Sequence, residues 1–132
     1  MTVTVPVKRV DLMGWHKYGA KKTTIDGISF PSKGEAETYS VLLLLQKGEV
    51  ISGLNLQETV YLTKAKISYK TDFSFTALKA VEKVWVEFKG VETDRWRLIK
   101  KLWKHYGPGR LQVYKANNRG VYLHEEIIPS GE

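Results

Sequence analysis

The chain has 132 residues, of which 42% are hydrophobic and 27% are charged, a composition typical of one folded domain. It contains no cysteine, which excludes disulfide scaffolds, thiolate catalysis and zinc–cysteine sites. The three histidines are isolated, and the longest apolar run, Val41 to Leu45, is too short to span a membrane. Because no signal pattern follows Met1, we expect a cytoplasmic protein without a membrane partner.

The net charge of +7 is unevenly distributed along the chain. Residues 1–33 carry net +4 and residues 89–119 carry net +7, whereas residues 34–88 carry net −1. Residues 120–132 carry net −3. Two basic stretches that flank a near-neutral middle favour a polyanionic partner such as nucleic acid over a basic protein with nothing bound.

The N-terminal third is predicted to lead into a helix. Residues 1–24 form a basic arm, with a short edge strand over 1–10 and a loop over 11–24. The core then spans about residues 25–128, and it starts with a strand or hairpin over 25–30. A helix follows from Ser32, its predicted N-cap, to about Lys47.

The remainder reads as strands and one more helix. We expect strands over 54–62, 67–75 and 83–89, a helix over 93–105, and closing strands over 111–114 and 121–128. This order predicts a single α/β domain with a mixed central sheet flanked by helices. Trp96 and Trp103 follow helical spacing and are expected in the core.

Alternation along two of these strands brings acidic residues together. Asp72 is expected on the polar face of one strand, opposite a face that carries Tyr69 and Phe73, and Glu87 on a face of the next. If the strands pair, the two carboxylates lie side by side and repel. A divalent cation would remove that cost, and hard oxygen ligands suit Mg²⁺ or Mn²⁺. The alternative is two surface acids neutralised by lysines.

Two further residues extend this candidate metal site. Glu35 lies on the core-facing stripe of the first helix, where a carboxylate is costly unless paired or metal-bound, although it could also complete a capping box with Ser32. Lys89 points the same way as Glu87, because it lies two residues further along the strand. It could stabilise charge at a phosphate or simply be solvated.

These residues carry a family resemblance. Glu35, Tyr69-Lys-Thr-Asp72-Phe73 and Val86-Glu87-Phe-Lys89-Gly90 resemble the PD-(D/E)XK nuclease core, with Thr71 where the family has a proline. Over about residues 17–106 the chain is also similar to small bacteriophage proteins related to archaeal-type Holliday junction resolvases. The resemblance implies a restriction-endonuclease-like core with Glu35, Asp72 and Glu87 as metal ligands and Lys89 as a catalytic group.

The resemblance also implies an activity and a partner. The expected enzyme is a Mg²⁺-dependent endodeoxyribonuclease, with Mn²⁺ as a substitute, that resolves four-way DNA junctions as a homodimer, in the host cytoplasm if phage-encoded. Two equivalent sites match the two-fold symmetry of the junction. Ser32 would contact DNA, a role that competes with helix capping, and Gln57 would lie near the site unless it is ordinary surface. The expected DNA contacts are Lys17, Lys21, Lys22, Ser32, Gln57, Arg95 and Arg97.

Two other classes of function stay open. One is a related nuclease that acts on flap, branched or single-stranded DNA. The other is a non-catalytic nucleic-acid-binding module whose acidic residues are surface groups. Divalent-dependent cleavage of a panel of DNA structures distinguishes all three.

Overall fold

The computed structural model describes residues 22–130, which form a mixed α/β domain. Neither helix in this part of the chain is long and apolar enough to cross a bilayer. The elements, in chain order, are β1 Thr23–Ile25, β2 Ile28–Phe30, α2 Lys33–Lys47, β3 Ile51–Tyr61, β4 Ser68–Ala77, β5 Glu82–Phe88, α3 Asp94–Tyr106, β6 Arg110–Asn117 and β7 Gly120–Ile127.

The main sheet has five strands in the order β3-β4-β5-β6-β7. Strands β3, β4 and β5 are antiparallel neighbours, β6 runs parallel to β5, and β7 returns antiparallel to β6. The parallel step requires a crossover, and α3 supplies it. The predicted mixed sheet is therefore confirmed.

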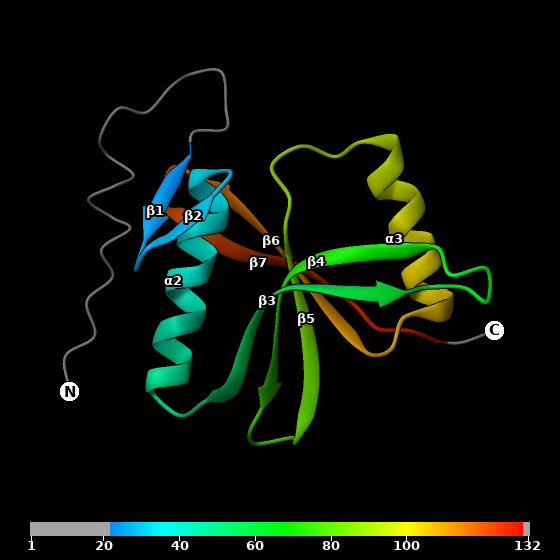
Figure 1. Cartoon of the computed structure of the whole chain (residues 1–132), viewed down its shortest axis with the longest axis horizontal. Helices are drawn as coiled ribbons and strands as arrows, with labels where there is room; N and C mark the ends of the chain where they lie inside the picture. Colours follow the sequence, from blue (N-terminus) through cyan, green and yellow to red (C-terminus); the bar gives the residue numbers. More distant parts are fainter. Residues whose placement is uncertain (1–21, 131–132) are drawn as a thin grey trace.

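The sheet separates two hydrophobic clusters, one under each helix. Val84 and Val86 of β5 belong to the cluster around α2, whereas Trp85 between them belongs to the cluster around α3. Because neighbouring residues of a strand point to opposite faces, the helices cover opposite sides of the sheet, as Figure 1 shows. Trp96 and Trp103 are 1% and 0% exposed, which confirms their predicted place in the core.

Local sequence signals explain where the elements begin. Asp26 and Gly27 both have positive φ, 52° and 78°, and they make the turn between β1 and β2. The hydroxyl of Ser32 accepts a hydrogen bond from the backbone N–H of Glu35 and caps α2. Thr93 caps α3 in the same way through the N–H of Trp96.

The predicted face of β4 is wrong in one respect. Phe73 packs in the cluster around α2, but Tyr69, four residues earlier in the strand, packs in the cluster around α3. The paired strand β3 makes the same change between Leu56 and Val60. Between them Gln57 adopts a φ of 60°, in the left-handed region, which breaks the regular alternation of side chains.

The other boundaries lie within three residues of the expected ones. Most of the loop predicted over residues 11–24 lies outside the described residues, and its last two residues belong to β1, which begins at Thr23. Strand β6 reaches Asn117 rather than residue 114, because its hairpin with β7 extends to the turn before Gly120. The edge strand predicted over residues 1–10 lies outside the described residues.

Candidate functional site

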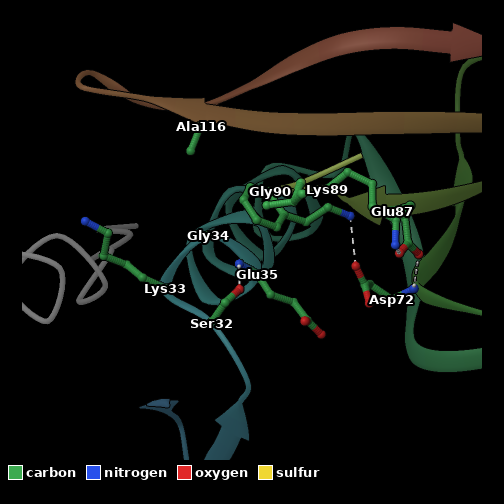
Figure 2. A pocket seen from close by; sticks show the side chains of 11 residues that line it. Ser32, Lys33, Gly34, Glu35, Asp72, Glu87, Lys89, Gly90 and Ala116 are labelled. Atoms are coloured by element: carbon green, nitrogen blue, oxygen red, sulfur yellow. Dashed lines mark hydrogen bonds and ion pairs between the residues drawn. The ribbon is translucent and has the colours of Figure 1, made fainter. Parts of the chain in front are cut away.

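A cavity of about 580 Å³ opens where the start of α2 meets the middle of β4 and the C-terminal end of β5. Figure 2 shows Glu35 of α2 and the N-cap Ser32 on one side, and Asp72 of β4, Glu87 of β5 and the following Lys89 on the other. All four predicted catalytic residues therefore line one cavity. The remaining lining residues are Lys33, Gly34, Phe88, Gly90, Val91 and Ala116.

Close packing of helix on strand positions Glu35. A Cβ atom at Gly34 would lie 1.9 Å from the ring of Phe88, so any other residue here would displace this ring from the first turn of α2. The next residue, Glu35, is only 7% exposed and is directed into the cavity. Its backbone N–H is bonded to Ser32 while its carboxyl group faces Asp72, so capping and the acidic site use different parts of Glu35.

The side chains of Asp72 and Glu87 link the middle of β4 to the C-terminal end of β5. The N–H of Asp72 donates to Oε1 of Glu87 over 3.2 Å, and the N–H of Phe88 donates to Oδ2 of Asp72 over 2.8 Å. In the register of the two strands, Phe73 lies opposite Val86. The same register places the preceding Asp72 opposite the following Glu87. The prediction that the two carboxylates lie side by side is confirmed.

The surroundings of the three carboxyl groups disfavour their ionised form. Burial raises the pKa of Asp72 to about 7, and the charge of Glu35 adds to the rise. Burial and then the charge of Asp72 raise the pKa of Glu87 to about 8. Burial and then the charge of Glu87 also raise the pKa of Glu35. A nearby cation would remove the repulsion that the three carboxylates share.

Lys89 supplies a positive charge beside this cluster. Its Nζ lies 3.3 Å from Oε2 of Glu87, and its backbone N–H donates to the carbonyl of Tyr114 in β6 over 2.9 Å. The amine also lies 4.9 Å from the centroid of the Trp96 ring and 5.9 Å from that of Tyr69. The Lys89 side chain is only 24% exposed, so it is not the solvated surface lysine of the alternative interpretation.

The donor set of the cavity fits a hard divalent cation. Glu35, Asp72 and Glu87 offer only oxygen ligands, the type that Mg²⁺ and Mn²⁺ prefer. Magnesium commonly takes one or two carboxylates and keeps several waters, so three direct contacts are not required. The hydrogen bonds to Asp72 and Glu87 leave lone pairs on both carboxylates.

A second group of possible ligands is not part of the cavity lining. One ligand atom each of Glu92, His124 and Glu125 falls within 4.8 Å of the others, while the three cavity carboxylates are spread more widely. Lys115 pairs with Glu92 over 3.2 Å, and Lys100 pairs with Glu125 over 3.1 Å. These lysines already neutralise the acids, so the group is a surface ion-pair network.

The structure places the predicted DNA contacts in different ways. Ser32 lines the cavity, and its hydroxyl can still donate its proton while its oxygen caps α2. Gln57 is exposed and lies opposite Asp72 in the register of β3 and β4, outside the cavity lining. Lys22 is exposed at the start of the described chain. Lys17 and Lys21 lie outside the described residues.

Arg95 and Arg97 lie in the first turns of α3 and are exposed. The positive charge of Arg95 acts on the hydroxyl of Tyr69, which places this arginine near the acidic cluster. Arg97 pairs with Asp94 over 2.8 Å, and both side chains are open to solvent. An exposed pair of this kind is weak enough for a phosphate to displace the carboxylate.

Comparison with known proteins places the chain in a family without assigning an activity. The family model described as "Protein of unknown function (DUF1064)" matches residues 15–118. The chain belongs to this family. No curated protein matches the chain. The matched segment contains every residue of the acidic cluster together with Lys89 and α3, so the cavity belongs to the part of the chain that defines the family.

Two aromatic neighbours of the cluster are not indicated by the sequence. The Tyr69 hydroxyl donates to Oε2 of Glu87 over 2.6 Å, and burial together with the charge of Glu87 raises the pKa of Tyr69. Trp96 was expected only as a core residue, yet its ring faces Lys89. Strict alternation placed Tyr69 with Phe73, away from Glu87, so the sequence contained no signal for this contact.

Proposed function

We propose that this chain is a divalent-metal-dependent endodeoxyribonuclease with a PD-(D/E)XK-like core. The observation that carries the proposal is that buried Glu35 and Glu87 and half-buried Asp72 line one cavity beside Lys89. Three carboxylates with raised pKa values are a costly arrangement that a divalent cation would stabilise. The positions of the acids on a helix, a strand and the next strand agree with the resemblance in the sequence.

The residues of the cavity have distinct roles in this proposal. Asp72, Glu87 and Glu35 would hold Mg²⁺, directly or through water. When bound, the ion supplies positive charge to the scissile phosphate and lowers the pKa of the attacking water. Lys89 places its ammonium group where negative charge develops on the phosphate. The hydroxyl of Ser32, at the cavity rim, donates a hydrogen bond to a phosphate oxygen.

We propose four-way DNA junctions as the substrate and a homodimer as the active form. The net charge of +7 and the exposed arginines of α3 support a DNA partner recognised through its backbone. Each chain contributes this acidic cavity once, whereas resolving a junction requires two symmetric cuts. The choice of junctions over other branched DNA rests on the resemblance to junction resolvases.

A substrate panel tests this function. Four-way junction, flap, linear duplex and single-stranded DNA are incubated with the full chain in Mg²⁺, in Mn²⁺ and in EDTA. We expect paired nicks in opposing strands of the junction, with both ions and not with EDTA. Equal cleavage of duplex and junction would indicate a general nuclease. Tight binding without cleavage under all conditions would indicate a non-catalytic binding module.

Removing Arg95 and Arg97 together should weaken DNA binding without regard to sequence. Each lost phosphate contact reduces the slope of log affinity against log salt concentration by about one. We therefore expect this slope to be smaller by about two when both arginines are replaced by alanine. Fluorescence anisotropy with junction DNA at several salt concentrations measures the slope. The matched control removes Lys47 and Lys79, two exposed lysines at other places on the molecule. An unchanged slope in the arginine variant would show that α3 does not face DNA.

A further inference from the structure

The amine of Lys89 is held from three directions. Oε2 of Glu87 lies 3.3 Å from Nζ, and the rings of Trp96 and Tyr69 have their centroids 4.9 and 5.9 Å from it. A lysine side chain has four flexible bonds, and fixing it in one position costs conformational entropy. Three contacts on one amine, at a side chain only 24% exposed, offset that cost.

The two rings pack in the hydrophobic cluster around α3. Trp96 is 1% exposed, in the first turn of α3, and Thr93 caps this turn through the N–H of Trp96. The ring of Tyr69 lies 6.0 Å from that of Trp96, centroid to centroid, and both belong to the cluster around α3. The aromatic surface that faces Lys89 is therefore fixed by the core.

Tyr69 also acts on the carboxylate itself. Its hydroxyl donates to Oε2 of Glu87 over 2.6 Å, the same oxygen that faces Lys89. Oε1 of Glu87 accepts a single bond from the N–H of Asp72 and keeps a lone pair. One carboxylate oxygen is thus occupied by Tyr69 and Lys89, and the other can face an ion.

We propose that Tyr69 and Trp96 are positioning residues that hold Lys89 and Glu87 in their working geometry. This inference rests on the proposed nuclease function. The aromatic faces attract the ammonium group without an acceptor atom, and Glu87 occupies at most one of its three N–H donors. The remaining donors can bind a phosphate oxygen. Neither aromatic residue contacts the substrate in this scheme; both act through Lys89 and Glu87.

Two conservative substitutions test the proposal. Tyr69→Phe keeps the ring and removes the donor to Glu87, and Trp96→Phe keeps an aromatic but a smaller face at Lys89. Substituting residues that support a catalytic or metal-binding group typically lowers activity or metal affinity by about 10–100-fold. We expect a loss of that size in the single-turnover rate with saturating junction DNA, at a temperature well below unfolding, and less than a twofold change in DNA affinity. Tyr114→Phe, a buried tyrosine of the other cluster, is the control.

A double-mutant cycle separates positioning from a general effect on folding. In a Lys89→Met background, Trp96→Phe should cause no further loss of rate, because the residue through which it acts is gone. Full rates in both single variants would overturn the proposal. Rate losses that multiply in the double variant would also overturn it, because they would show a role independent of Lys89.

A readout without catalysis keeps the inference separate from the proposed function. Ring currents of Trp96 and Tyr69 should shift the NMR signals of the Lys89 ε-methylene protons upfield in the wild-type protein, and Trp96→Phe should reduce the shift. Unshifted wild-type signals would contradict the positioning geometry. If the wild-type chain cleaves no DNA but its Lys89 signals are shifted, the nuclease proposal fails while the contact is supported.

Discussion

Asp72→Asn should abolish cleavage while the protein still folds and binds DNA. The amide oxygen of asparagine can still accept the bond from the N–H of Phe88, so the join between β4 and β5 is kept. The ligand charge is lost, and a loss of several kcal/mol in charge stabilisation corresponds to a rate decrease of at least ~1000-fold. Junction affinity should be unchanged or higher, because one negative charge near the phosphate is removed. Single-turnover cleavage and anisotropy measure the two effects.

Other carboxylates provide the comparison for this result. Glu87→Gln should behave like Asp72→Asn, and Glu35→Gln should also be severely impaired. Glu82→Gln is the matched control, because Glu82 lies in the same strand as Glu87 but pairs with Arg110, outside the cavity. A near-wild-type rate for folded Asp72→Asn would contradict the metal assignment. A lower melting temperature as the sole effect of Glu35→Gln would assign that residue to structure.

The metal-free protein should lose stability as the pH rises from about 4 to about 8. In this window the folded chain holds protons on Asp72 and Glu87 more tightly than the unfolded chain, because their pKa values are raised to about 7 and about 8. The free energy of unfolding therefore decreases with pH. At pH 8 without metal, Asp72→Asn should be more stable than wild type by at least about 2 kcal/mol, and this difference should disappear near pH 4.

Denaturant unfolding in EDTA at several pH values measures this effect. Adding Mg²⁺ should stabilise the wild-type chain more at pH 8 than at pH 5, since protons compete with the ion for the carboxylates.

Glu58 is the control, because its pKa is shifted in the opposite direction to those of Asp72 and Glu87. Burial raises its pKa, but hydrogen bonds from Lys83, Ser74 and Trp85 outweigh burial, and the net pKa is lowered. Glu58→Gln should therefore destabilise the protein at neutral pH, and less so in acid. A pH-independent difference between Asp72→Asn and wild type would contradict the pKa shifts.

The acidic cluster could be predicted because each of its members obeys a local rule. Alternation along a strand and an antiparallel neighbour place Asp72 beside Glu87, and two residues of spacing place Lys89 with Glu87. The N-cap at Ser32 fixes the start of α2 and, with it, the helical face of Glu35. These relations depend on a few neighbouring residues, and for that reason they can be read from the sequence.

Contacts between distant elements required the tertiary structure. The left-handed backbone at Gln57, which is not a glycine, accompanies the change of face that brings Tyr69 to Glu87, and no turn residue signals it. Trp96 reaches Lys89 only because α3 crosses over the sheet between β5 and β6. The sequence alone determined the chemical groups of the cavity. The packing of α3 and the twist of the β3–β4 pair decided which neighbours surround them, because such contacts depend on the whole sheet rather than on spacing along one strand.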